Sequence, residues 1–170
     1  MGLAYIGIGS NVEREQNIRS ALTALSTLGS NLRISSVYES PAYGFAGDNF
    51  YNLVTGFETS FSPQDLSVKL GQIEDGLGRL RNVPRFSSRT LDLDLLLYDD
   101  LVIHEDSLDL PRSDIESYAF VLCPLAEIAA DTLHPEKGLK ISKIWAEFDK
   151  TEQKIWKVEV DLSIQEDLHT

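Results

Sequence analysis

One segment of the chain combines a cluster of arginines with a pair of aspartates. Residues 79–94 read RLRNVPRFSSRTLDLD, so four arginines precede two aspartates that alternate with leucines. The whole chain carries a formal net charge of −12, and positive charge gathered in one place against that background indicates a site for an anionic ligand. Because the guanidinium group matches the geometry of phosphate oxygens, a polyphosphate is the obvious candidate.

Asp92 and Asp94 are predicted to lie side by side on one face of a strand. Apolar and acidic residues alternate from Leu91 to Leu95, and a strand with this period buries the leucines and turns both carboxylates to the opposite face. Two carboxylates so close together favour a divalent cation, and Mg²⁺ is usually held by one or two carboxylates plus substrate phosphates. The alternative is a set of solvated ion pairs between arginines and aspartates, each worth about 0–1 kcal/mol.

The stretch between Arg81 and Arg89 favours ligand binding over simple ion pairing. It contains Pro84, Ser87 and Ser88 and shows neither a helical nor a strand period. A loop of this kind can close over a ligand and carry its arginines with it.

The hydrophobic pattern predicts the element order β-α-β-β-α-β. A nearly continuous apolar run at 3–9 is typical of a buried strand, and Ser10 with Glu13 forms a capping-box signature for the helix that follows. Ser62-Pro63 opens the second helix in the preferred order of cap and proline. With further strands at 32–38, 51–59 and 91–98, this order indicates an α+β, ferredoxin-like fold, in which helices pack on an antiparallel sheet.

Shorter elements are expected after this core. They are a turn at Asp99-Asp100 into a short partner strand at 101–103, a helix through 122–130, an amphipathic helix around 141–148, and an edge strand at 155–162.

Length and composition indicate one domain over residues 1–170, with its core at about 3–130. A chain of 170 residues with 42% hydrophobic content can build one sizeable core. The start lacks the basic region and long apolar run of a signal peptide, and no apolar stretch is long enough to cross a bilayer, so we expect a cytoplasmic protein without a membrane partner. The acidic balance argues against a nucleic-acid partner. The single cysteine, Cys123, lies in an apolar run and is expected to be a buried small hydrophobe rather than a nucleophile.

These residues resemble the 6-hydroxymethyl-7,8-dihydropterin pyrophosphokinase family. The resemblance rests on Arg79-x-Arg81, on the string RTLDLD at 89–94, on Gly9-Ser10-Asn11 after the first strand, and on Ser40-Pro41 ahead of an aromatic–Asn pair. It covers about 3–128 in the right order. It implies that a monomer, with two Mg²⁺ ions, transfers the β,γ-pyrophosphoryl group of ATP to the hydroxymethyl oxygen of the pterin in folate biosynthesis and leaves AMP.

The same resemblance implies a role for each matching residue. Asp92 and Asp94 would hold the metal ions, one of which lowers the pKa of the pterin hydroxyl, and Arg79 and Arg89 would be the catalytic arginines that steady the transferred group. The implied ATP-binding residues are Glu74, Arg81, Arg85, Phe86, Leu95 and Arg112. The implied pterin-binding residues are Ser40, Pro41, Tyr43, Phe50, Asn52 and Phe120, with the two phenylalanines stacking on the ring and Asn52 reading its hydrogen-bonding groups.

Simpler interpretations exist for some of these residues. Glu74 is equally well a solvated acid of a helix, and without the resemblance Phe50 and Phe120 would be assigned to the core. A diverged relative that acts on another acceptor and a non-catalytic ligand-binding module are the alternative functions.

Phe86 stands where the family usually has a tryptophan, and the sequence departs from the family pattern in three further places. Pro111-Arg112-Ser113 stands where the family has Pro-His-Tyr, Tyr118 replaces an arginine and Ser88 a proline. Because the aspartates and the two key arginines are present, we interpret these changes as altered ATP binding, with Arg112 supplying the positive charge that is missing elsewhere.

Overall fold

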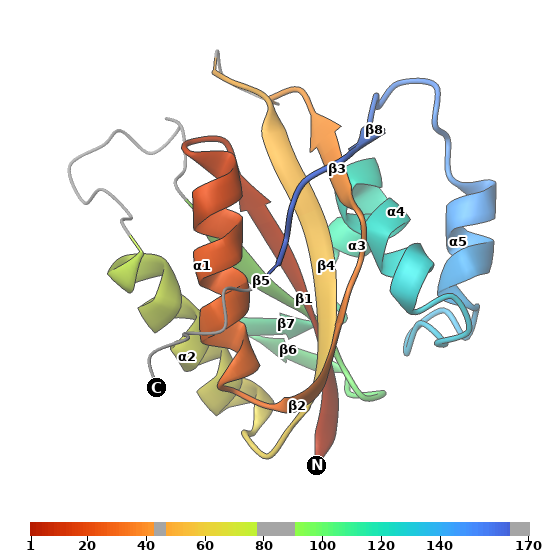
Figure 1. The fold of residues 1–170 in the computed structure, drawn as a ribbon. Coiled ribbons are helices and arrows are strands. Elements are labelled where there is room, and N and C mark those ends of the chain that lie inside the picture. Colours follow the sequence, from red (N-terminus) through yellow and green to blue (C-terminus); the bar gives the residue numbers. More distant parts are fainter. Residues whose placement is uncertain (43–46, 78–90, 164–170) are drawn as a thin grey trace.

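An antiparallel sheet runs through the centre of the protein, with helices on both of its faces (Figure 1). The computed structural model describes residues 1–42, 47–77 and 91–163. Within these residues six strands form the sheet, in the order β5-β1-β4-β3-β8 with β2 also paired to β4. The strands are β1 (Gly2–Ser10), β2 (Ser30–Ile34), β3 (Val37–Ser40), β4 (Phe50–Thr59), β5 (Asp92–Tyr98) and β8 (Trp156–Val158). The predicted α+β, ferredoxin-like class is confirmed.

Each face of the sheet packs against its own group of helices. On one face α1 (Arg14–Ser26) and α2 (Pro63–Gly76) bury Ile18, Leu22 and Leu66 against the even-numbered residues of β1. On the other face lie α3 (Asp114–Ser117), α4 (Ala119–Ile128) and α5 (Ile141–Glu147), which form a second hydrophobic cluster. The protein therefore has two apolar layers, and the second one borders the pocket described below.

Strand β5 has the predicted alternation at its start and loses it at a bulge. Leu93 and Leu95 lie in the first cluster, and the register with β1 shifts between Leu95 and Leu97. The bulge turns both Leu96 and Leu97 toward the second cluster. Asp92 and Asp94 precede the bulge, so they share one face of the strand as the sequence predicts.

The predicted strand at 32–38 is two strands. β2 and β3 both pair with β4, and Ser35 lies between them. Its backbone N–H donates to Val54 O at 2.9 Å, and its Oγ accepts from Val54 N at 2.9 Å. A serine side chain here replaces a backbone partner of the ladder, which explains the break.

The N-terminal cap predicted for α2 is present in the structure, whereas the one predicted for α1 is not. At α2, Ser62 Oγ accepts from Asp65 N at 3.1 Å and Pro63 occupies the first turn, so that prediction is confirmed. The capping box at α1 is wrong, because Ser10 belongs to β1 and the residue before the helix is Glu13, in a left-handed conformation with φ 42° and no capping side chain. Asn17, from inside the helix, donates to Val12 O at 2.6 Å instead.

The later elements follow the prediction in part. A partner strand at 101–103 is wrong, because β6 (Ile103–Glu105) pairs with β7 (Leu108–Leu110) in a separate hairpin. The helical region after Pro111 is divided between α3 and α4, and the edge strand is confirmed as the shorter β8 on β3. Cys123 on α4 is half-buried rather than buried, and burial raises the pKa of its thiol.

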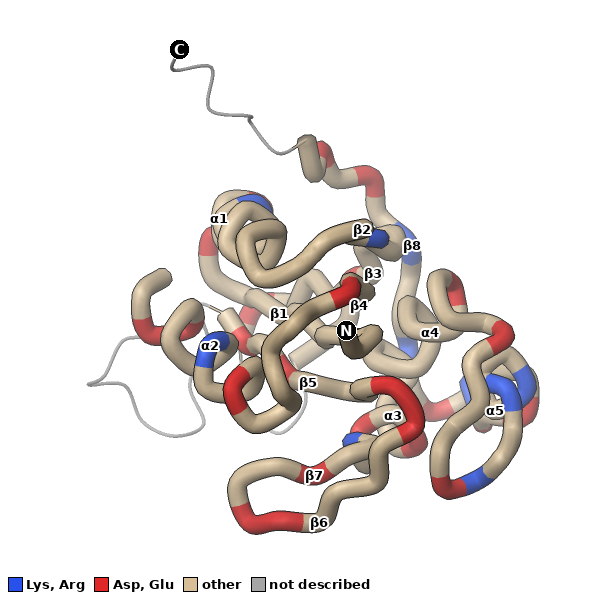
Figure 2. The backbone as a smooth tube through the Cα atoms, turned by 90° about the horizontal axis from the view of Figure 1, so that it is seen from below, with Lys and Arg blue, Asp and Glu red and all other residues tan. Residues whose placement is uncertain are grey.

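The described surface is mainly acidic. Figure 2 shows Asp and Glu on most elements, including the β6–β7 hairpin, while Lys and Arg occur in small groups. An anionic ligand that approaches this surface meets repulsion unless cations at its site offset the charge. In the part of the chain that the structure describes, no helix is both long and apolar enough to cross a membrane.

His134 should make the protein less stable in acid. It is 3% exposed, and its Nδ1 accepts from Glu136 N at 3.3 Å and Lys137 N at 3.2 Å. Burial lowers the pKa of His134, so the unfolded chain binds a proton below about pH 6.5 that the folded ring resists. We expect the free energy of unfolding, from urea titrations between pH 7.5 and 5, to fall on acidification by up to about 1.4 kcal/mol per pH unit from this group, and His134→Asn to flatten that slope.

His104 provides a control of opposite sign. Its Nδ1 lies 2.6 Å from Asp109 Oδ1, and this contact raises the pKa of His104. Protonated His104 therefore favours the folded state in acid, so His104→Asn should steepen the loss of stability. A wild-type slope that His134→Asn leaves unchanged would show that His134 does not cause it.

Candidate active site

A pocket of about 290 Å³ lies on the sheet face that carries α3 and α4. Its walls come from β1, β3, β4, β5 and the α3–α4 segment, so segments far apart in the sequence meet there. The pocket brings together seven of the predicted site residues: Ser40, Pro41, Phe50, Asn52, Asp92, Asp94 and Phe120.

Two glycines of β1 keep the floor of the pocket open. Gly7, Ile8 and Gly9 line it, and the side chains of Ile6 and Ile8 belong to the first cluster. A Cβ added to Gly9 would lie 3.5 Å from Asn52 Oδ1. That is ordinary contact distance, so the glycine is not required by the backbone, but any larger side chain would fill the space beside Asn52.

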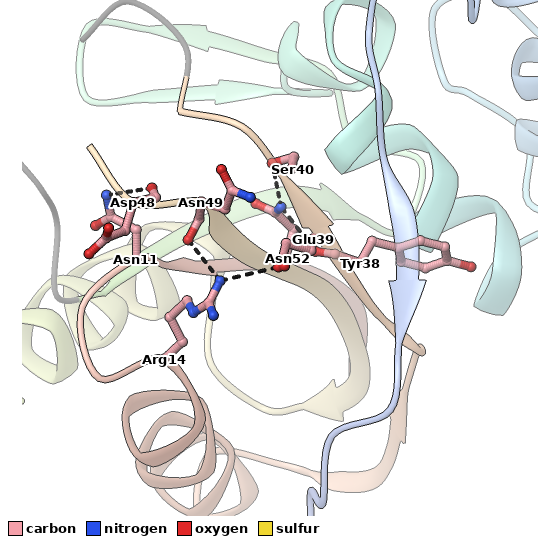
Figure 3. A network of polar contacts seen from close by, with 8 residues as sticks. All are labelled: Asn11, Arg14, Tyr38, Glu39, Ser40, Asp48, Asn49 and Asn52. Atoms are coloured by element: carbon pink, nitrogen blue, oxygen red, sulfur yellow. Dashed lines mark hydrogen bonds and ion pairs between the residues drawn. The ribbon is translucent and has the colours of Figure 1, made fainter. Parts of the chain in front are cut away.

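Asn52 is held in one orientation by the strands around it. It is 4% exposed, and its Nδ2 donates to Ser40 Oγ at 2.9 Å and to the backbone oxygen of Tyr38 at 3.2 Å (Figure 3). A backbone oxygen can only accept, so the nitrogen of the amide must point to β3. The Oδ1 acceptor then lies over Gly9, on the pocket side.

Glu127 ties β3 to α4, the helix that carries Phe120. Its carboxylate accepts from Ser36 N at 2.7 Å, from Ser36 Oγ at 3.1 Å and from Tyr38 Oη at 2.7 Å. Burial alone would raise the pKa of Glu127, but the hydrogen bonds from Tyr38 and Ser36 outweigh it and lower that pKa. This ionised carboxylate fixes the distance between two walls of the pocket.

Arg112 places a positive charge beside one of the two aspartates. Its backbone N–H donates to Leu96 O at 3.0 Å, which holds it next to β5. The guanidinium then lies 3.5 Å from Asp94 Oδ1 and 3.1 Å from Asp114 Oδ2. Burial would lower the pKa of Arg112, but Asp94 and Asp114 outweigh it and raise that pKa, so the group stays charged. The negative potential at Asp94 therefore attracts a cationic group in this protein, the guanidinium of Arg112.

Asp92 and Asp94 fit Mg²⁺ only if other oxygen atoms complete its shell. Among the described residues, no group of three or more His, Cys, Asp and Glu side chains is arranged to hold a metal ion. Mg²⁺ commonly takes one or two carboxylates and completes its six ligands with water and substrate phosphates. Two carboxylates on one strand face, open to a pocket, match that pattern.

Two further predicted residues do not line the pocket. Glu74 on α2 accepts from Leu93 N at 2.9 Å and so covers part of the exposed edge of β5. Leu95 is 5% exposed and packs in the first cluster, so any contact it makes with a ligand would be through its backbone. The predicted residues Tyr43, Arg79, Arg81, Arg85, Phe86 and Arg89 lie outside the described residues.

The pocket also contains residues that the sequence analysis did not assign to it. Tyr118, noted there only as a departure from the family pattern, stacks on Phe120 with ring centroids 4.9 Å apart. Asp114, Gly7, Gly9 and Leu96 also line the pocket. The pairing of Tyr118 with Phe120 two residues later is a weak signal. Asp114 gives none, because only the fold brings it, together with its sequence neighbour Arg112, to Asp94 and the pocket.

The fold and the pocket together define an α+β protein in which carboxylates, a buried amide and aromatic side chains line one cavity on a face of the sheet. Residues 5–130 match the sequence profile of the 7,8-dihydro-6-hydroxymethylpterin-pyrophosphokinase family. The chain belongs to this family, and it is therefore an ATP-dependent enzyme, a diphosphokinase.

Individual relatives agree with this assignment. A 2-amino-4-hydroxy-6-hydroxymethyldihydropteridine pyrophosphokinase of Aquifex aeolicus is 38% identical over 137 residues, which cover 79% of this chain and 85% of the relative. The protein of the same name from Haemophilus influenzae is 38% identical over 140 residues, covering 80% and 87%. The wild-type HPPK-DHPS structure of Plasmodium falciparum has the same fold, with a TM-score of 0.67, 13% identity, and coverage of 85% of this chain and 44% of that longer one.

Proposed function

We propose that this pocket is where the enzyme transfers the pyrophosphoryl group of ATP to the hydroxymethyl group of 6-hydroxymethyl-7,8-dihydropterin, releasing AMP and the pterin diphosphate. The observation that carries the proposal is that Asp92 and Asp94 line the same pocket as Asn52, Phe50 and Phe120. Phosphoryl transfer depends mainly on alignment and on neutralisation of charge. A pocket in which carboxylates for a metal ion lie next to side chains that can bind a flat ring would supply the alignment.

The pterin is assigned to the part of the pocket between Phe50 and Phe120. Both aromatic side chains line the pocket, and Tyr118, which also lines it, supports Phe120 by stacking. Since both amide hydrogens of Asn52 are directed to β3, its Oδ1 would accept from an N–H of the ring rather than donate to it. This orientation would select a ring edge rich in donors, and Ser40 and Pro41 would complete the wall.

The triphosphate is assigned to the side of Asp92 and Asp94. These carboxylates would hold the two Mg²⁺ ions, which when bound neutralise phosphate charge and lower the pKa of a nearby hydroxyl group. Arg112 would add a positive charge at Asp94, and Glu74, Leu95, Arg81, Arg85 and Phe86 would contribute to ATP binding. Arg79 and Arg89 would steady the transferred group, and Tyr43 would join the pterin site.

The same proposal includes the setting in which the enzyme works. We expect a single-domain monomer in the cytoplasm, where it takes up ATP and the pterin as small-molecule substrates and has no nucleic-acid partner.

Product analysis tests the proposed reaction. Purified protein incubated with ATP and Mg²⁺ should form AMP only when hydroxymethyldihydropterin is added, and EDTA should abolish the reaction. AMP formation with a different hydroxymethyl acceptor but not with this pterin would indicate a diverged relative. Pterin binding without any AMP formation would overturn the enzymatic proposal in favour of a binding module.

A further inference from the structure

Arg14, the first residue of α1, contacts the two strands that form the pterin side of the pocket. Its NH1 donates to Asn49 O at 3.1 Å and lies 3.4 Å from Glu39 Oε2. Its guanidinium carbon lies 3.8 Å from the centroid of the Tyr51 ring. Figure 3 shows the side chain reaching from the helix to the end of β3 and the start of β4.

Each of these partners is next in sequence to a residue of the pocket. Glu39 pairs across the sheet with Tyr51, and the adjacent pair is Ser40 with Phe50. Because successive side chains of a strand point to opposite faces, Glu39 and Tyr51 lie on the face away from the pocket. Arg14 therefore holds from behind the same two strands that present Ser40 and Phe50 to the ligand.

Asn49 extends this arrangement beyond the strands. It directly precedes Phe50, and the bond from Arg14 fixes its carbonyl group. Asn11 donates from Nδ2 to Asp48 O at 3.2 Å, which ties the same short segment to the turn after β1. The turn itself is set by the left-handed Glu13. The entry to β4 is thus fixed by side chains of the turn that leads into α1.

These contacts need an arginine. An exposed ion pair contributes about 0–1 kcal/mol to stability. The pair here is partly buried instead, because the side chain of Arg14 is 29% exposed and that of Glu39 only 16%. A planar guanidinium can stack on Tyr51 and donate to two acceptors at once, whereas the ammonium group of lysine cannot reproduce the stacking.

We propose that Arg14 is a positioning residue for pterin binding, which acts by fixing Phe50 and Ser40 against the ring. Arg14 does not line the 290 Å³ pocket, so it acts through these residues and not by touching the pterin. The inference rests on the proposed placement of the pterin between Phe50 and Phe120. It assigns a role in substrate affinity to a residue outside the family motifs described above.

Arg14→Ala should raise the pterin KM and the pterin Kd, measured by fluorescence titration, by about tenfold or more. The KM for ATP should change by less than about twofold, since Arg14 contacts β3 and the start of β4, whereas Asp92 and Asp94 lie on β5. Arg14→Lys should recover only part of the affinity, because it keeps the charge near Glu39 and loses the stacking on Tyr51. Glu39→Gln, which keeps the bond to Asn49 and the stacking, should have a smaller effect than Arg14→Ala.

Arg19→Ala is the matched control on the same helix. Arg19 lies 3.6 Å from Glu15 Oε2 and donates to Asp161 O at 3.2 Å, so its loss should leave both KM values unchanged. If Arg14→Ala binds pterin as tightly as wild type and Arg19→Ala do, the positioning role is wrong while the enzyme assignment stands. A fall in the thermal midpoint and in kcat with both KM values unchanged would reduce Arg14 to a purely structural residue. If wild type itself neither binds nor converts the pterin, the proposed function fails first.

Discussion

Replacing Asp94 with asparagine is expected to lower kcat by roughly 10²–10³-fold, the usual size of the loss when one charge-stabilising group of a transition state is removed. The amide keeps the shape of the carboxylate and its place on the pocket face of β5, but it lacks the charge that attracts Mg²⁺. Steady-state AMP formation at saturating ATP and pterin measures kcat. Titration of the protein with Mn²⁺, followed by electron paramagnetic resonance, should show weaker metal binding without any substrate present.

The effect of Asp94→Asn on folding should be small. Arg112 also pairs with Asp114 at 3.1 Å, so its charge is still balanced in the variant, and we expect the free energy of unfolding to change by less than about 1 kcal/mol. Asp131→Asn is a suitable control, because Asp131 lies on the surface, 3.5 Å from Lys140 Nζ. An Asp94→Asn variant with near-normal turnover and normal Mn²⁺ binding would remove the metal assignment.

The sequence predicted the fold where local and global signals agree. The alternation at Leu91–Leu95 and the cap at Ser62 each depend on a short stretch of chain, and the structure confirms both. The capping box at Ser10 and Glu13 failed because β1 extends as far as Ser10 to pair with Tyr51, and pairing in the sheet outweighs a local capping preference. The break at Ser35 depends on Val54, nineteen residues away, and no local pattern contains it.

The candidate site could be predicted only where a motif marks it. The alternation at 91–95 indicated Asp92 and Asp94, the resemblance to a known family added Phe50, Asn52 and Phe120, and the structure places all five in one pocket. The sequence could not show that Arg112 lies beside Asp94, because that contact depends on the bond from Arg112 N to Leu96 O at the bulge of β5. Contacts made across the sheet and around a bulge are properties of the tertiary structure.

Replacing Asn52 with aspartate should both destabilise the protein and weaken pterin binding. The new oxygen would take the place of Nδ2, which lies 3.2 Å from the Tyr38 carbonyl oxygen in a site that is 4% exposed. Two acceptors would then face each other without a proton, at a cost of about 3 kcal/mol at pH 7. The strands would no longer hold Oδ1 over Gly9, so we expect the pterin Kd to rise by about tenfold or more.

The pH dependence of stability distinguishes the effect of the unpaired carboxylate from a change in the shape of the site. Burial raises the pKa of a carboxyl group at such a site, so the penalty should be largest at neutral pH and should shrink as the pH falls toward about 4, where the unfolded chain also becomes protonated. A protonated aspartate can again donate to Tyr38 O. The difference in free energy of unfolding between variant and wild type, measured by urea titration at pH 5 and pH 7.5, should therefore be smaller at pH 5.

Asn17→Asp is the matched comparison for Asn52→Asp. Asn17 is 8% exposed and donates from Nδ2 to Val12 O at 2.6 Å, so its replacement should show the same kind of pH-dependent destabilisation. It lies on α1, outside the pocket, and can affect the pterin site only through the turn at Val12, so the pterin Kd should rise less than it does in Asn52→Asp. A loss of pterin affinity of equal size in both variants would mean that general destabilisation weakens binding. A loss confined to Asn52→Asp would instead support the assignment of its Oδ1 to the pterin ring.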